Sequence, residues 1–284
     1  MRKFKATKTA YKILLKNSDG LIYPFLRDDN GDEEILCISP NHGRSFLVGR
    51  DNDRYIISKG NGLSYTQYTF MNTRELGEDA WGMLLETDAV RDFNLGLEIE
   101  SLGIKTNKME YVLKLDQGFR ISDSNSDLTI PVLLQYSVES PHRINDAAYM
   151  TSQQISNEIS KWNALNDRGF KKYHLIAANV LIRNLRILHD NNILHNAIHE
   201  QNYTWALELL DFELACSPNY PYSSEDDMRH AKNLYHRELI QTYVIIYHIA
   251  EVLHEEIDFH AIDALFAEYG FNLSIYQVSP VCDK

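Results

Sequence analysis

The stretch from Leu194 to Cys216, LHNAIHEQNYTWALELLDFELAC, constrains the fold of this chain more than any other. It predicts a loop, a short apolar strand over residues 205–210 and a second loop. Asn202 lies before this strand, and Asp211 follows it directly. In a tight hairpin the two side chains converge, and their amide and carboxylate oxygens suit a hard divalent cation. A buried strand flanked by capping loop residues explains the same pattern, and the stretch alone favours neither interpretation.

The order of His195, Asn202 and Asp211 fits the plan of protein-kinase-like folds. In those folds an Asn and an Asp hold a metal ion on the phosphates of ATP. Two features differ from an ordinary protein kinase. Asn202 and Asp211 are only nine residues apart, and Ala197 stands where a kinase keeps its catalytic Asp.

Apolar patterning predicts strands early in the chain and helices late. We expect strands over 21–26, 34–39, 45–49, 54–58, 108–115 and 128–138, and a basic strand or arm over 1–16. We expect helices over 78–102, 145–166, 171–190, 224–254 and 257–269. The expected fold class is α+β, a two-lobed protein-kinase-like fold. Residues 1–138 would form the β-rich N-lobe, and residues 139–284 the mostly helical C-lobe with the metal-binding hairpin.

Lys59 ends the predicted strand 54–58, and Gly60-Asn61-Gly62 follows it. Backbone N–H groups of such a stretch can cradle phosphate while the lysine supplies charge. Ordinary turn chemistry is the simpler explanation for glycines beside a hairpin. Asp92 falls inside the predicted helix 78–102, where a carboxylate can hold the strand lysine on the phosphates. A solvated helix Asp is the alternative.

Bulk composition narrows the choice of partners and compartment. The net charge is −12, from 40 acidic and 28 basic residues, which argues against a general nucleic-acid binder. No apolar run is long enough to span a membrane. Three cysteines are too few for a disulfide scaffold, so we expect a cytoplasmic protein.

Two further stretches, YIISKGNGLSYTQY and AVRDFNLGLEIESLGIKTNKMEYVL, resemble the selenoprotein O family (SelO, bacterial YdiU). That family has a strand ending in Lys-Gly-x-Gly-x-x-x-Tyr and an Arg-Glu-Phe helix closing in Leu-Gly-Ile-x-Thr. The central stretch resembles the family's His-Gly-x-x-Asn-Thr-Asp-Asn loop and its Ile-Asp-Tyr-Gly strand end. The Asn-to-Asp interval is nine residues there too. The resemblance covers about residues 35–220.

The resemblance implies a kinase fold that binds ATP in a flipped orientation and transfers AMP to hydroxyl side chains of proteins. Lys59 would contact the phosphates and Asp92 would hold Lys59. Asn202 and Asp211 would bind Mg²⁺ or Mn²⁺. The implied nucleotide-binding residues are Gly43, Arg44, Lys59, Gly60, Gly62, Gly82, Arg143 and Asp211.

Some of these positions keep the family pattern only in part. Gly43 and Arg44 resemble a Gly-Asp-Gly-Arg turn, and Gly82 is the one residue kept from an Asp-Gly-Arg motif. Arg143 matches the second of two nucleotide-binding arginines in the family, while the first falls at Tyr136.

Two departures concern the chemistry. Gln201 stands at the position of the family's presumed general base, and an amide cannot accept the proton. General-base help is worth about 10²–10⁴ in rate. Glu213 replaces a glycine of the family and adds negative charge beside the metal position.

The family also carries a cysteine after its metal Asp and a Cys or selenocysteine near its C-terminus, which can form a disulfide. Cys216 and Cys282 match these positions, and the resemblance therefore implies a redox pair. Two thiols are the alternative in a reducing cytosol. Tyr220 and Tyr222 are candidate self-modification sites, or aromatic residues packed on the lobe.

Three functions remain open from the sequence. The first is a SelO-like adenylyltransferase that uses ATP and Mg²⁺ or Mn²⁺ to modify a Ser, Thr or Tyr of a protein, which could be the chain itself. The second is a pseudokinase that acts as a nucleotide- or protein-binding module, favoured by Ala197, Gln201 and Glu213. The third is a kinase-like phosphotransferase, against which Ala197 counts.

Overall fold

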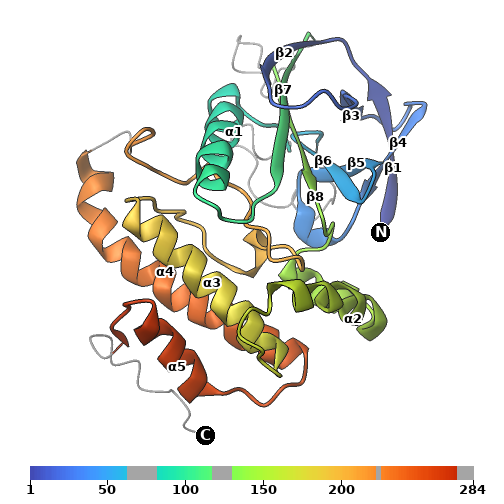
Figure 1. The fold of residues 1–284 in the computed structure, drawn as a ribbon. Helices are drawn as coiled ribbons and strands as arrows, with labels where there is room; N and C mark the ends of the chain where they lie inside the picture. The colour runs from blue at the N-terminus through green and yellow to red at the C-terminus, as the bar shows by residue number, and fades with distance from the viewer. Residues whose placement is uncertain (63–81, 117–129, 222–224, 274–284) are drawn as a thin grey trace, which may run out of the picture.

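The computed structural model describes residues 1–62, 82–116, 130–221 and 225–273 (Figure 1). An antiparallel sheet of eight strands is ordered β2-β7-β8-β6-β5-β4-β1-β3. Its strands are β1 (Arg2–Lys8), β2 (Tyr11–Lys16), β3 (Phe25–Arg27), β4 (Glu33–Cys37), β5 (Ser45–Asp51), β6 (Arg54–Lys59), β7 (Lys108–Leu115) and β8 (Val132–Val138). The basic opening stretch thus forms two strands, β1 and β2.

The sequence pattern of the central strand agrees with its burial in the sheet. Every residue of β8, which lies between β7 and β6, is buried, as its continuous apolar run predicts. β5 and β6 form a hairpin whose turn includes Asn52 at φ 50°, a left-handed conformation that asparagine tolerates. This hairpin places Lys59 at the end of β6.

The helices gather on the C-terminal side of the chain, except for α1 (Glu86–Ser101), which lies against β7 and β8. The others are α2 (Ser152–Ser160), α3 (Tyr173–Asp190), α4 (Glu225–Val252) and α5 (Phe259–Glu268). Short 3₁₀ turns are η1 (Pro40–His42), η4 (Ile144–Tyr149), η5 (Lys161–Leu165) and η6 (Glu200–Asn202). α4 and α5 both pack on α3. None of the described helices is long and apolar enough to cross a membrane.

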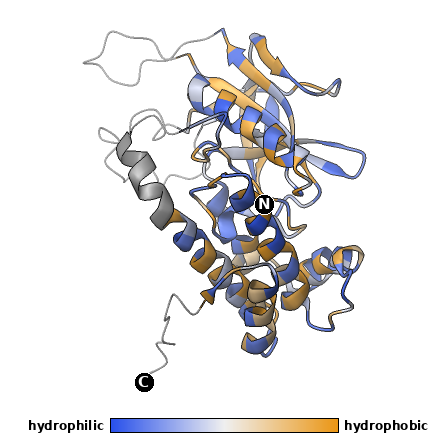
Figure 2. Cartoon of the chain, turned by 60° about the vertical axis from the view of Figure 1, so that its left-hand side comes forward, coloured by the Kyte–Doolittle hydropathy of each residue, from blue (hydrophilic) through white to orange (hydrophobic). Residues whose placement is uncertain are grey.

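One hydrophobic core joins the sheet to the helices. It contains Ile57 of β6, Val112 of β7 and Leu134 of β8 together with Leu181 of α3 and Ile245 of α4. In Figure 2 the hydrophobic colour lies mainly on the strands and helices, and the hydrophilic colour on many of the loops that connect them. The α+β kinase-like layout, with strands and one helix first and helices after, is therefore confirmed. The division at residue 138 into two domains stays a prediction, although β8 ends at Val138.

The predicted strand over 205–210 is wrong. Within it Leu209 makes only isolated bridges, to Thr106 and to Tyr203. The Thr204 hydroxyl accepts hydrogen bonds from the backbone N–H groups of Ala206 and Glu208, and Leu207 adopts φ 58°. The apolar run is therefore a buried turn, in which the Thr204 hydroxyl takes two N–H groups while Leu209 N donates to Lys105 O and Leu210 N to Asn202 O.

Other predicted boundaries move for identifiable reasons. The helix expected from residue 78 begins at Glu86, because Leu84 O accepts from Val132 N and Leu85 is extended; residues 63–81 lie outside the description. The strand expected over 21–26 is replaced by the shorter β3, which begins after Pro24 because proline lacks an N–H donor. The helix expected over 145–166 divides into η4, α2 and η5.

Candidate functional site

Lys59 is the centre of the candidate site. Its side chain is 5% exposed, and its Nζ lies 3.1 Å from Asp92 Oδ2, 2.7 Å from Asp211 Oδ1 and 3.0 Å from Glu213 Oε2. Asp92 belongs to α1, whereas Asp211 and Glu213 follow the buried turn. Three separate parts of the chain thus meet at one ammonium group. A strand lysine held by a helix carboxylate is the arrangement by which kinases position phosphates.

The charges of this cluster shift the pKa values of its four members. Burial would lower the pKa of Lys59, but Asp211, Asp92 and Glu213 outweigh burial and raise it well above its ordinary value. Burial would raise the pKa of Asp211, but Lys59, Arg143 and Arg44 lower it overall. Burial raises the pKa values of Asp92 and Glu213, with Lys59 opposing the rise. Lys59 and Asp211 therefore form a fully charged pair at neutral pH.

Asp211 is aimed at Lys59 by its loop. It adopts φ 68°, and the next N–H, that of Phe212, donates to Asp92 Oδ1 over 2.9 Å. The Phe212 ring packs against the His195 ring with centroids 5.5 Å apart. His195 is fully buried, and its Nε2 donates to Leu210 O over 2.8 Å. His195 thus supports the loop from within the core.

Asn202 is the last residue of η6, and its backbone is hydrogen-bonded to the residue that precedes Asp211. Leu210 N donates to Asn202 O over 2.9 Å, and Asn202 Nδ2 donates to Ala197 O over 2.9 Å. The amide nitrogen is thereby used to orient the side chain. Gln201, at the expected general-base position, instead donates from Nε2 to Asn41 O over 2.9 Å. It therefore links η6 to η1, which precedes β5.

The oxygen atoms near Lys59 suit a hard metal ion. One oxygen each from Asp92, Asp211 and Glu213 lie within 4.8 Å of one another. Carboxylate and amide oxygens are the ligands that Mg²⁺ and Mn²⁺ prefer, so the donor set fits either ion. The predicted pair was Asn202 and Asp211, and the structure adds Asp92 and Glu213 as neighbours. A metal ion here would share these carboxylates with the ammonium of Lys59.

Gly43 and Arg44 join η1 to β5 at the edge of the site. Gly43 has φ 54°, and nothing lies within 4 Å of the position that its Cβ would take. Arg44 Nη2 lies 2.7 Å from each carboxylate oxygen of Glu213, and Nη1 donates to Met83 O over 3.1 Å. Arg44 therefore adds a second cation beside Lys59.

Gly60, Gly62 and Gly82 have left-handed backbones, with φ 99°, 108° and 71°. Gly60 N donates to Arg44 O over 3.0 Å, and Gly62 N donates to Gly82 O over 3.1 Å. A Cβ on Gly60 would lie 2.5 Å from the carbonyl oxygen of Val132. Turn chemistry accounts for these glycines, and their contact with a nucleotide stays a prediction.

Arg143 comes from the segment between β8 and η4 and is 5% exposed. Its Nε finds no hydrogen-bond partner among the described residues. Tyr136, at the position of the other expected arginine, is buried in β8, and burial raises its pKa. Arg143 is thus a buried cation near Asp211 with a donor to spare.

Sequence reasoning missed a polar cluster around Asp146. This carboxylate accepts from the Ser39 hydroxyl, from His42 Nε2 over 2.8 Å and from Arg143 N over 2.7 Å. Burial would raise the pKa of Asp146, but its hydrogen bonds to His42, Ser39 and Arg143 N hold it at about 2. The cluster ties the loop before Arg44 to η4. No periodic pattern marks it, since Ser39 and His42 lie more than a hundred residues from Asp146 in the sequence.

Two buried acids were also missed. Glu208 bonds Arg54 Nη2 over 2.9 Å and the backbone N of Glu139, and it is completely buried. Glu238 of α4 accepts from Asn196 N over 2.7 Å and thereby anchors the loop after His195. A glutamate inside the apolar run TWALELLDF was the available signal, because a buried acid needs a partner.

Of the predicted cysteine pair, the structure describes Cys216. Cys216 is buried and pairs through its backbone with Leu194. Cys282 and Tyr222 lie outside the described residues, and Tyr220 packs against the core. The redox pair therefore stays a prediction.

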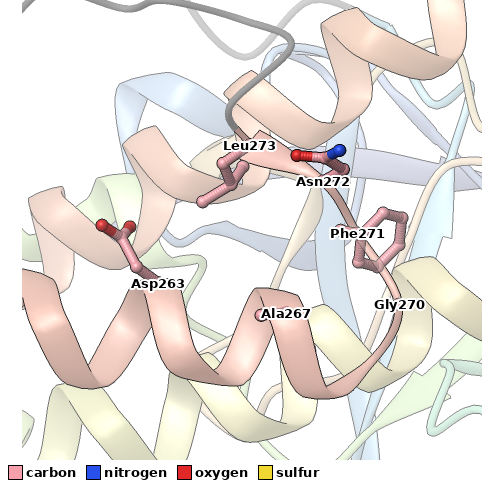
Figure 3. A pocket seen from close by; sticks show the side chains of 6 residues that line it. All are labelled: Asp263, Ala267, Gly270, Phe271, Asn272 and Leu273. Atoms are coloured by element: carbon pink, nitrogen blue, oxygen red, sulfur yellow. The ribbon is translucent and has the colours of Figure 1, made fainter.

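A separate hollow of about 460 Å³ lies at the end of α5 (Figure 3). Its lining is Asp263, Ala267, Gly270, Phe271, Asn272 and Leu273. α5 lies at the end of the molecule opposite the sheet (Figure 1). The hollow is therefore not part of the Lys59 site.

No protein-family model and no curated protein sequence matches this chain. Among solved structures, a Stt7 homolog from Micromonas algae, soaked with ATP, aligns with a TM-score of 0.43 and 13% identity over 94% of this chain and 84% of that chain. A Toxoplasma gondii specific rhoptry antigen kinase domain aligns with a TM-score of 0.37 and 12% identity over 84% and 76%. Likenesses this distant carry no argument about activity, and the kinase-like description rests on the Lys59 cluster and the order of elements.

Proposed function

We propose that this chain is a metal-dependent nucleotidyltransferase that moves AMP from ATP to a Ser, Thr or Tyr side chain of a protein. The observation that carries the proposal is the buried contact of Lys59 with Asp92 and Asp211. Such a cluster positions the phosphates and neutralises their negative charge. These two effects are the main contributions of a protein to phosphoryl-transfer chemistry. The proposal keeps the cytoplasmic location and the protein acceptor, possibly the chain itself, that we expect from the sequence.

The roles of the residues follow from their charge and place. Lys59, Arg44 and Arg143 would bind phosphate oxygens, and Asp92 would keep Lys59 in position. Asn202 and Asp211 would hold Mg²⁺ or Mn²⁺, which when bound withdraws charge from the reacting phosphate. The acceptor hydroxyl forms a bond to the α-phosphorus, the α–β bond breaks, and pyrophosphate leaves with the electron pair.

We propose transfer of AMP and not of phosphate because this chain lacks the catalytic Asp of a kinase and has a shorter interval between its two metal-binding residues. Ala197 removes the base that activates the acceptor in a kinase. The short interval between Asn202 and Asp211 matches the resemblance to selenoprotein O instead. Gln201 is bonded to Asn41 O and provides no base, so the hydroxyl proton passes to solvent and we expect slow turnover.

A binding module without catalysis is the second candidate. The observation that favours it is the ion pair of Arg44 with Glu213, whose Nη2 and Oε2 atoms lie 2.7 Å apart. A site whose cations are already paired binds phosphate less readily. Such a module would act through a protein partner.

The test uses ATP labelled at the α-phosphate and, separately, at the γ-phosphate, with Mg²⁺ or Mn²⁺. We expect protein label from α-ATP alone and its loss in Asp211→Ala. Label from γ-ATP alone would mean phosphate transfer. Bound nucleotide without label would support the binding module.

A further inference from the structure

We infer that Glu213 is a built-in competitor for the phosphate position of the Lys59 site. This inference rests on the proposed function, because it concerns how the same site takes up an anionic ligand. Glu213 would thus differ in role from the metal ligands Asn202 and Asp211 and from Asp92, the partner of Lys59.

The geometry places the Glu213 carboxylate between two cations. Arg44 Nη2 lies 2.7 Å from both of its oxygens, and Lys59 Nζ lies 3.0 Å from one of them. Arg44, just before β5, and Lys59, at the end of β6, form the pair of donors that a phosphate group would use. Because the carboxylate already satisfies both donors, a phosphate and Glu213 exclude one another there.

The other two acids of the cluster are held differently. Asp92 also accepts from Phe212 N, and Asp211 lies in a left-handed loop position that aims it at Lys59. Among the described residues, the contacts of the Glu213 carboxylate are with Arg44 and Lys59. The next residue, Leu214, is 60% exposed. The Glu213 side chain itself is 18% exposed, so it lies at the solvent edge of the site and can leave the cations without breaking the contacts that hold Asp92 and Asp211.

The consequence is a lowered apparent affinity for anions. A ligand that binds only the open arrangement has its dissociation constant raised by the inverse of the open fraction. If the site is open about one-tenth of the time, removing the competitor tightens binding about tenfold. Glu213 thus sets the ligand concentration at which the site fills.

The test is calorimetric titration of inorganic pyrophosphate, without metal, into the full chain. Glu213→Gln should bind about tenfold more tightly than wild type. Glu213→Asp keeps the charge but is about 1.5 Å shorter, so it does not reach both cations, and it should also bind more tightly. Glu251→Gln, which removes an exposed charge on α4, should bind as wild type does. Circular dichroism melting verifies that each variant is folded.

Two results would overturn the inference. One is a folded Glu213→Gln that binds pyrophosphate no better than wild type. The other is a Glu213→Asp that behaves as wild type while Glu213→Gln improves, since that pattern reports charge alone. Neither result depends on AMP transfer, so failure here and failure of the label experiment are distinguishable.

Discussion

At the scale of single residues, the site is a balance of buried charges. Lys59 alone contacts three carboxylates, and Arg44 contacts one of them. Removing one member of a buried pair leaves an uncompensated charge and typically costs about 3–5 kcal/mol. This cost explains why the cluster is surrounded by supporting hydrogen bonds, such as that from Phe212 N to Asp92. Asp146 gives the nearby loop a comparable anchor.

The Asp146 anchor predicts a loss of stability in acid. Its pKa falls from the ordinary 3.8 to about 2 in the folded chain. A depressed folded-state pKa contributes stability above about pH 4 that is lost as pH falls through about 2. The difference is worth about 2 kcal/mol. Urea unfolding of Asp146→Asn should show this loss already at neutral pH and a flatter acid dependence. Parallel acid profiles for Asp146→Asn and wild type would contradict the account; Glu251→Gln is the control.

At the scale of elements, the predictions from sequence succeeded where a periodic pattern was continuous. β7 spans the predicted residues 108–115, and α3 and α5 lie within their predicted ranges. The strand predicted over 205–210 was wrong because an apolar run does not reveal whether its backbone N–H groups meet one partner strand or several separate acceptors, such as the Thr204 hydroxyl and Lys105 O. Lys59, Asp92 and Asp211 were found because a known arrangement linked them. Asp146 was missed since only tertiary contacts create its role, whereas Glu208 was missed although a glutamate inside an apolar run signals a buried acid with a partner.

The turn after β6 provides a prediction at this scale. Gly60→Ala forces an L-residue to φ 99° and places Cβ 2.5 Å from Val132 O. Backbone strain and the clash together should lower the free energy of unfolding by at least about 2 kcal/mol. Gly103→Ala is the matched control, because its φ is 83° but nothing lies within 4 Å of its Cβ position. Urea titration should show a larger loss for Gly60→Ala, and equal losses would refute a steric role for this turn.

At the scale of the whole molecule, the sheet and the helices share one core and several buried ion pairs. Ile57 and Leu134 belong to the same cluster as Leu181 and Ile245. The Arg54–Glu208 pair crosses from β6 to the buried turn over 2.9 Å. These contacts couple the two predicted lobes, and two smaller buried clusters, around Ile35 and around Leu113, lie wholly within residues 1–138.

Scanning calorimetry should therefore show a single unfolding transition, with equal calorimetric and van't Hoff enthalpies. Glu208→Ala, which leaves Arg54 without this partner, should lower the temperature of the whole transition. Two separable transitions, or an effect of Glu208→Ala on only one of them, would show that residues 1–138 and 139–284 unfold independently.

The central claim is that Lys59 and its partners hold the phosphates of a nucleotide. The most direct test is calorimetric titration of ATP with Mg²⁺ into wild type, Lys59→Met, Glu213→Gln and the double variant. We predict that Lys59→Met weakens binding at least about tenfold, equivalent to about 1.4 kcal/mol, in both backgrounds. Equal affinities with and without Lys59, or no binding by either wild type or Glu213→Gln, would contradict the claim.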